Sequence, residues 1–381
     1  MNRTHAKLLI QAGIVGIVIL AVLAIANITA DNLERVGITT GIGFLDDPSG
    51  FEVAFSLIDH TSNHTHLNIF WVGILNTLLA AALAIFFGTI IGLIIGVAQL
   101  SSNKITAFIA RVYVEAFRNI PVLLNIFFWY FITITIFPRV ANSYNLADMI
   151  YLNQRGLSLP SIDMSGMGYL ITFILLVIPF LAPTLASKAS IFNHTFGKQS
   201  KFKLFSITMA CSISLIVALI FFGVINPQIE IPQATRFNIN GGIEIIPEFF
   251  ALIVGLSIYH GAFIAENVRG GILAVSKGQT EAALSTGLSN WQTMRFVVIP
   301  QALRIIIPPY ISICLNIFKN TSLGAAIAFP ELMNVFAGTS LNQTGNAVEI
   351  ILMVMLFYFA VSIIISIILN IYNQRIQIIE R

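Results

Sequence analysis

The chain alternates between long apolar stretches and shorter polar segments, and this pattern predicts membrane-spanning helices. A helix needs about 20 mostly apolar residues to cross the hydrocarbon core of a bilayer. Stretches of that length occur at 8–28, 67–100, 108–137, 168–186, 204–225, 245–265, 305–329 and 347–372. Some exceed what a bilayer requires, so we expect tilted spans or helices that extend into water. The pattern therefore predicts an all-α polytopic membrane protein with about eight transmembrane helices.

The distribution of charged residues predicts the orientation of these spans. Cytoplasmic loops of membrane proteins are enriched in Lys and Arg. The segment 29–66 carries six acidic residues and one Arg, whereas 187–203 carries four Lys and no acid. If both termini are cytoplasmic, eight successive spans place most of the basic segments on the cytoplasmic side. We therefore expect cytoplasmic termini and a periplasmic 29–66 loop.

The first apolar stretch has a second interpretation. It follows Arg3 and Lys7 and so resembles a signal peptide. Its apolar run of about 20 residues exceeds the roughly 7–15 that are usual in a signal peptide. We expect a retained helix.

The composition excludes several classes of protein. Hydrophobic residues make up 57% of the chain and charged residues only 10%, whereas a soluble domain carries about 25% charged residues. Too few polar residues are available to cover a water-soluble fold, and a net charge of +3 gives no electrostatic footprint for nucleic acid. The two cysteines lie inside apolar stretches without metal-ligand spacing, so we interpret them as packing residues.

Three glycines in the second predicted span repeat at four-residue intervals. Gly88, Gly92 and Gly96 form two overlapping G-x-x-x-G spacings. Such stripes allow two helices to approach closely in lipid. They favour a helix-packing seam here, although glycine is also common in membrane helices in general.

The polar segment 266–304 is not an ordinary loop. Good helix formers surround Glu281, and Gly287 interrupts them. We predict two short helices hinged at Gly287, with Glu281 near the start of the first and Pro300 at the end of the second. Because this element is held between two spans, we expect it to contact a cytoplasmic partner. Its sequence reads Glu281-Ala282-Ala283-Leu284-Ser285-Thr286-Gly287, and Val297-Val298-Ile299-Pro300 follows after nine residues.

This spacing resembles the signature loop of bacterial ABC importer permeases, most closely the histidine and glutamine permease family. Within this family, the chain is similar to the general L-amino-acid permeases, because it has an additional N-terminal helix and an insert. Further matching blocks occur in the order expected for the family. They are Arg118-Asn119-Ile120-Pro121, Phe127-Phe128-Trp129-Tyr130-Phe131, the stretch 262–271, Lys277-Gly278-Gln279, Pro300-Gln301-Ala302-Leu303-Arg304 and Lys319-Asn320-Thr321-Ser322-Leu323. In the last block, Asn320 stands where the family has Asp.

The resemblance implies a type I importer core of five helices with two additions. The core would comprise 67–137 and 244–381, including a cytoplasmic coupling loop at 266–304. The additions would be an N-terminal helix with its periplasmic loop, 1–66, and an insert with two transmembrane helices, 138–243. In such a core, Glu281, Ala282, Ala283, Gly287 and Pro300 belong to the loop that couples to the ATPase.

The resemblance also implies a function and partners. It implies the permease subunit of an ATP-driven importer that takes up L-amino acids from a periplasmic binding protein by alternating access. A second permease subunit, in a heterodimer, and two ATPase subunits that bind ATP and Mg would complete the assembly in the bacterial inner membrane.

The chain itself carries no motif for ATP hydrolysis. It lacks the G-x-x-x-x-G-K-[ST] phosphate loop, so we expect a transport subunit without its own ATPase, bound cofactor or metal. The alternative is a secondary transporter or channel, because Pro179 and Pro183 could break the fourth predicted span.

Ionisable residues within the predicted spans are candidates for contact with the substrate. Glu266 lies at the inner end of the sixth span, and Lys319 lies near the middle of the seventh. Lys319 could bind a substrate carboxylate, and the resemblance implies that Glu266 binds the ammonium. Alternatively, Glu266 pairs with Arg269 three residues along the helix, and Lys319 bonds carbonyl groups or an acidic partner.

Uncharged polar residues near these positions are candidates for hydrogen bonds to the substrate. A buried imidazole with a satisfied hydrogen bond is an equally simple interpretation of the histidine among them. These candidates are Asn316, Asn320, Tyr259 and His260. Glu115 and Arg118, near the inner end of the third span, are candidates for gate or packing roles.

Overall fold

The computed structural model describes residues 41–163, 199–235 and 237–376 continuously, with single positions between 13 and 28 and between 168 and 179. The predicted spans 8–28 and 168–186 therefore lie outside the continuously described residues. The chain divides into two compact units. One comprises Met1–Thr133 with Ile246–Arg381, and the other comprises Ile134–Ile245.

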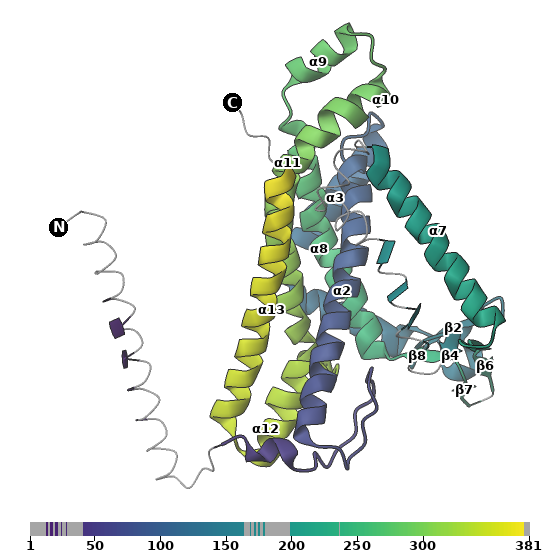
Figure 1. Ribbon diagram of the computed structural model, residues 1–381, viewed down its shortest axis with the longest axis vertical. Helices are drawn as coiled ribbons and strands as arrows, with labels where there is room; N and C mark the ends of the chain where they lie inside the picture. Colours follow the sequence, from purple (N-terminus) through teal and green to yellow (C-terminus); the bar gives the residue numbers. More distant parts are fainter. Residues whose placement is uncertain are drawn as a thin grey trace. The chain divides into compact units, whose positions relative to one another are not determined.

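The first unit is a bundle of long apolar helices (Figure 1). Its helices are α2 (His66–Ala98), α3 (Lys104–Arg118), α4 (Val122–Phe131), α8 (Pro247–Leu273), α9 (Lys277–Ser285), α10 (Asn290–Thr293), α11 (Ile299–Asn320), α12 (Leu341–Thr344) and α13 (Ala347–Ile376). Short 3-10 and π segments of this unit are η1 (Gly43–Asp46), η4 (Met294–Val298), η5 (Thr321–Ile327) and η6 (Met333–Ser340). The π segment η2 (Ile132–Ile136) follows α4 and crosses the boundary between the units. Among the described residues, four helices are long and apolar enough to span a membrane, or five if the bent pair α3–α4 counts as one span. The predicted total of eight stays a prediction.

The predicted span 108–137 is not one straight helix. It is split into α3 and α4, whose axes differ by 105°. Pro121 lies at the N-terminal cap of α4. Proline lacks an N–H donor and biases the preceding residue away from helical geometry. The break therefore follows from Pro121, which the hydropathy pattern alone did not reveal.

Helix α8 occupies the centre of the first unit, packed against α2, α3, α4 and α11. Side-chain groups donate hydrogen bonds to main-chain carbonyl groups across these helix contacts. Such bonds are expected where lipid offers no competing water. Asn125 Nδ2 of α4 donates to Gly255 O at 2.7 Å. Tyr113 Oη of α3 donates to Ile258 O at 2.6 Å. Asn267 Nδ2 of α8 donates to Ile306 O of α11 at 2.8 Å.

The three regularly spaced glycines lie where α2 packs on α8, which confirms the predicted seam. A Cβ added at Gly92 would lie 2.5 Å from Ile264 Cβ, and one added at Gly96 would lie 2.8 Å from Ala265 O. At Gly88 the nearest atom would be Ser257 O at 3.4 Å. The helix backbones are therefore closest toward the C-terminal half of α2.

At the other end of the bundle, a buried carboxyl group links the segment 329–334 to α13. Glu331 has no exposed surface. Its carboxylate oxygens accept the N–H groups of Met333 and Asn334 at 2.9 and 2.8 Å. They also accept the hydroxyl of Tyr358 in α13 at 3.2 Å. Burial raises the pKa of the Glu331 carboxyl to about 8, and these donors offset part of the rise.

The segment around Glu331 is also attached to α2. Asn76 Nδ2 donates to Pro330 O at 2.8 Å, and the Thr77 hydroxyl accepts the N–H of Leu332 at 3.2 Å. Gly73 leaves room for this approach, because a Cβ there would lie 2.8 Å from Leu332 Cα. The segment 329–334 therefore bridges α2 and α13.

The second unit contains short strands that the sequence pattern did not predict. A four-stranded antiparallel sheet has the order β1 (Tyr144–Leu146), β2 (Ile150–Asn153), β3 (Gly156–Leu159) and β8 (Ile243–Ile245). Two smaller sheets pair β4 (Ser161–Asp163) with β5 (Gln228–Glu230), and β6 (Gln233–Ala234) with β7 (Ile239–Asn240). Strands of two to four residues are too short to produce a clear alternation of apolar and polar positions.

The same unit contains one long helix, α7 (Gln199–Phe221), and a 3-10 turn, η3 (Val140–Asn142). Helix α7 overlaps the predicted span 204–225. Its apolar part, Phe205–Phe221, is shorter than the roughly 20 residues that a full span needs.

The glycine seam gives a first prediction. Gly92→Leu forces side-chain atoms against the Ile264 side chain of α8, and overpacking of this kind costs about 1–3 kcal/mol. We expect a lower midpoint of thermal unfolding for the purified protein in detergent. Gly270→Leu is the matched control, because a Cβ at Gly270 meets nothing within 4 Å. Equal stability of the two variants would contradict the seam.

The buried carboxyl group gives a second prediction. Its folded-state pKa of about 8 lies above the ordinary value of 4.5, so the protonated form favours the folded state. This stabilising contribution is complete below pH 4.5 and is lost as the pH rises through 8, at about 1.4 kcal/mol per pKa unit. Unfolding midpoints at pH 5, 7 and 9 should fall more steeply for wild type than for Glu331→Gln.

The control for that experiment is Glu52→Gln, which removes an exposed carboxyl group and should keep the wild-type pH profile. Parallel profiles for wild type and Glu331→Gln would show that Glu331 does not titrate in this range.

Candidate functional site

Four of the predicted hydrogen-bonding residues line one pocket between α8 and α11. The pocket has a volume of about 150 Å³. Its walls are Tyr259, His260 and Phe263 from α8, and Ile313, Asn316 and Asn320 from α11. Residues three and four apart in a helix share a face. The spacing of 313, 316 and 320 therefore places these three side chains on the face of α11 toward α8.

A hydrogen bond between the two helices defines the chemistry of this pocket. Asn320 Nδ2 lies 3.1 Å from His260 Nε2. An amide nitrogen only donates, so Nε2 accepts and the imidazole is neutral with its proton on Nδ1. The His260 ring also packs edge-on against Tyr259, with centroids 4.9 Å apart. The pocket therefore offers neutral polar groups and aromatic rings, with no charged side chain in its walls.

Glu266 and Arg269 form an ion pair rather than lining this pocket. Arg269 Nη2 lies 2.5 Å from Glu266 Oε1, and Arg269 Nε lies 3.0 Å from Oε2. The i, i+3 spacing on α8 brings them together, as one of the two interpretations predicted. The Glu266 carboxylate thus already has a cationic partner within the chain. Its contact with a substrate stays a prediction.

The structure does not bring Lys319 to the His260 pocket. Lys319 lines a different, largely apolar pocket of about 400 Å³ between α11 and α13. It precedes Asn320 by one residue, a rotation of about 100° around the helix, so it points to another side of α11. No ion pair involves Lys319 within the part of the chain that the structure describes.

The two candidates on α3 are exposed side chains. The Arg118 guanidinium lies 5.7 Å from the centroid of the Phe263 ring, so Arg118 contacts a residue of the pocket wall from outside. The Glu115 main-chain carbonyl accepts Asn119 Nδ2 at 2.7 Å, within the last turn of the helix. Neither residue lines the His260 pocket.

The predicted glycine hinge is present after α9. Gly287 has φ of +87°, a left-handed conformation that favours glycine. Its N–H donates to Leu284 O at 3.0 Å, and the N–H of Leu288 donates to Ala283 O at 3.3 Å. These bonds end α9 as in a Schellman motif. Helix α10 then begins at a capping box made by Ser289 and Gln292.

Two details of the predicted loop are wrong. Glu281 lies in the middle of α9, because the helix already begins at Lys277. Pro300 does not end the second helix but lies in the first turn of α11. The chain therefore continues from α10 through η4 into α11 without a helix stop.

Exposed apolar side chains on this loop were not predicted. Leu284, Trp291 and Phe296 are 42%, 68% and 60% exposed. Their apolar character is visible in the sequence, but their exposure depends on the rotational setting of α9, α10 and η4. Among the described residues, no group of three or more His, Cys, Asp or Glu side chains is placed to hold a metal ion.

Comparison with known proteins identifies the family. The family of binding-protein-dependent transport system inner membrane components matches residues 84–378. The putative amino-acid ABC transporter permease protein YhdX of Escherichia coli (strain K12) is 44% identical over 95% of this chain and 94% of its own length. The general L-amino acid transport system permease protein AapQ of Rhizobium johnstonii is 42% identical over 94% of this chain and 88% of its own.

The fold, the apolar spans and these similarities agree. The chain belongs to the family of binding-protein-dependent transport system inner membrane components. It is an integral membrane protein and a permease subunit of an ABC importer.

The hydrogen bond between Asn320 and His260 gives a third prediction. Asn320→Leu leaves the buried Nε2 of His260 without its donor, which costs about 1–3 kcal/mol. We expect a lower unfolding midpoint in detergent. The matched control is Asn316→Leu on the same face, where the amide is exposed and has no hydrogen bond in the described structure. If both variants unfold alike, the bond does not stabilise the packing of α8 on α11.

Proposed function

We propose that this permease subunit takes up L-amino acids delivered by a periplasmic binding protein, by alternating access driven by ATP. One observation carries the proposal. Relatives at 42–44% identity over nearly the whole chain bear names that specify amino-acid transport. A third, 34% identical over 92% of this chain, is the glutamate/glutamine/aspartate/asparagine transport system permease protein BztB of Rhodobacter capsulatus.

The proposed assembly contains a second permease subunit, in a heterodimer, and two ATPase subunits that hold ATP and Mg. The helices α9 and α10 dock on the ATPase subunits, and this chain binds no cofactor itself. Exposed Leu284, Trp291 and Phe296 support the proposal, because apolar and aromatic side chains are typical of buried interface centres. The left-handed turn at Gly287 fixes the angle between α9 and α10.

The proposed location is the bacterial inner membrane, with both termini cytoplasmic. Within the first unit, α9 and α10 lie at one end of the bundle and α12 lies at the other (Figure 1). The N-terminal end of α2 lies at the α12 end, so the acidic segment that precedes it is far from α9. Basic residues of 266–304 and acidic residues of 41–65 therefore belong to opposite ends, as the positive-inside rule requires.

The proposed path for the substrate passes the His260 pocket. Neutral donors and acceptors at Asn316, Asn320 and Tyr259 suit an amino acid without selecting one side-chain charge. At the inner end of the path, the substrate ammonium competes with Arg269 for the Glu266 carboxylate. Such competition gives a weak, reversible contact, which a translocation pathway needs.

A reconstituted complex tests this function and gives a fourth prediction. We expect uptake of L-amino acids into proteoliposomes that requires ATP and the loaded binding protein and is inhibited by vanadate. Gly287→Val introduces a β-branched residue at positive φ. The variant should insert and fold, yet lose most of the ATPase stimulation by loaded binding protein.

Gly287→Asn is the matched control, because Asn tolerates the left-handed conformation. It should keep most of the stimulation. Uptake that proceeds without ATP would instead identify a secondary transporter or channel. Full ATPase stimulation with Gly287→Val would show that α9 and α10 do not couple ATP hydrolysis to the loaded binding protein.

A further inference from the structure

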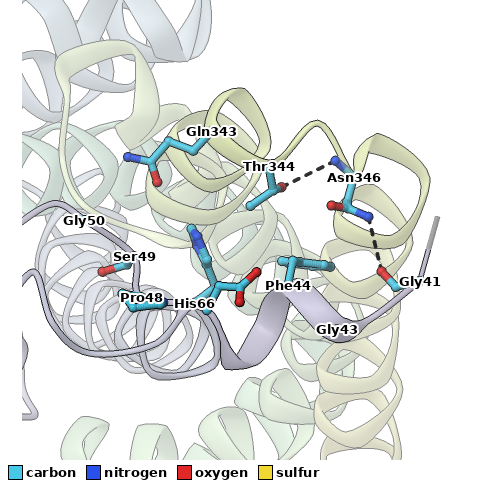
Figure 2. A pocket seen from close by; sticks show the side chains of 11 residues that line it. Gly41, Gly43, Phe44, Pro48, Ser49, Gly50, His66, Gln343, Thr344 and Asn346 are labelled. Atoms are coloured by element: carbon cyan, nitrogen blue, oxygen red, sulfur yellow. Dashed lines mark hydrogen bonds between the residues drawn. The ribbon is translucent and has the colours of Figure 1, made fainter. Parts of the chain in front are cut away.

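A second polar pocket lies in the first unit, at the end of the bundle where α2 begins. It has a volume of about 600 Å³. Figure 2 shows His66, at the start of α2, with residues of the 41–50 segment on one side and Gln343 to Asn346 on the other. The lining residues used below are Asp47, Ser49, His66, Gln343 and Asn346.

Two side chains in the wall of this pocket are buried and hold unused hydrogen-bonding atoms. Ser49 is 1% exposed, and its Oγ has no hydrogen-bond partner. His66 is 3% exposed; its Nδ1 lies 2.9 Å from Ser340 Oγ. No partner for its Nε2 occurs within the described part of the chain. Because buried polar atoms are nearly always paired, the unpaired Ser49 Oγ points to a ligand, and His66 Nε2 is a free nitrogen in the same pocket lining.

The surrounding structure holds the pocket open. The main-chain N–H of His66 donates to Asp47 O at 3.0 Å, and the N–H of Ser49 donates to His64 O at 2.7 Å. Across the pocket, Asn346 Nδ2 donates to Gly41 O at 3.2 Å (Figure 2). These hydrogen bonds hold the lining segments in place around the pocket.

The charge around this pocket is negative. Asp47 is the charged residue in its lining. Residues 41–66, which include this side of the lining, contain four acidic side chains and no Lys or Arg. The Asp47 carboxylate has no ion pair among the described residues. A bound cation would gain a charge-assisted hydrogen bond there.

We propose that this pocket binds a protonated amine. The Asp47 carboxylate and Ser49 Oγ accept its N–H donors, and His66 Nε2 accepts a third when Ser340 Oγ accepts from Nδ1. The exposed amide of Gln343 contacts the remainder of the ligand. If the proposed function holds, the amine belongs either to the free amino acid or to a lysine side chain of the docked binding protein.

Cadaverine is a suitable probe for this site, and 1,5-pentanediol is its uncharged counterpart. Calorimetric titration of the full chain in detergent at low ionic strength should detect cadaverine and not the diol. Asp47→Asn should weaken cadaverine binding about tenfold, as expected for the loss of one charge-assisted bond. Asp46→Asn is the matched control, because Asp46 is adjacent and exposed but does not line the pocket. It should change the affinity less than about twofold.

Absence of cadaverine binding, or equal weakening by both aspartate variants, would overturn the proposal. Competition then identifies the source of the amine. Displacement by L-alanine indicates the free substrate, and displacement only by the binding protein indicates its lysine side chain. Displacement by neither would also overturn the assignment. ATP-driven uptake in proteoliposomes reports on the proposed function independently, because its success without cadaverine binding would reject the amine site alone.

Discussion

The close approach of α2 and α8 determines much of the first unit. In lipid, apolar side chains gain little from meeting one another, so helices associate through tight packing and hydrogen bonds. Gly92 and Gly96 remove the side chains that would separate these two helices. With α8 packed in this position, its carbonyl groups at Gly255 and Ile258 accept hydrogen bonds from Asn125 and Tyr113. The positions of α3 and α4 follow from that contact.

Much of this bundle could be predicted from the sequence, because apolar length and glycine spacing are local properties. The predicted spans beginning at 67, 245, 305 and 347 each correspond to a long helix. The bend between α3 and α4 was missed, since Ile120 and Pro121 interrupt the backbone without interrupting the hydropathy. The short strands were missed because their pairing joins residues as distant as Leu157 and Ile245.

The candidate site was only partly predictable for a related reason. Spacing on a single helix suggested that Glu266 and Arg269 would pair, and they do. The grouping of His260 with Asn320, and the separation of Lys319 from both, depends on the rotational setting of α11 against α8. No local pattern determines that setting. The same limit applies to Ser49 and His66, which share a pocket although they lie on different elements.

The bonds around Glu331 also restrict how this subunit can move. Glu331 links the segment 329–334 to Tyr358 of α13, and Asn76 and Thr77 link the same segment to α2. Sliding α13 along α2 would separate Tyr358 from Glu331, or separate the Leu332 N–H and the Pro330 carbonyl from α2. Polar groups would then be unpaired away from water, which is unfavourable. At this end, the two helices therefore behave as one rigid body. Changes of shape in the first unit are therefore left to the opposite end of the bundle.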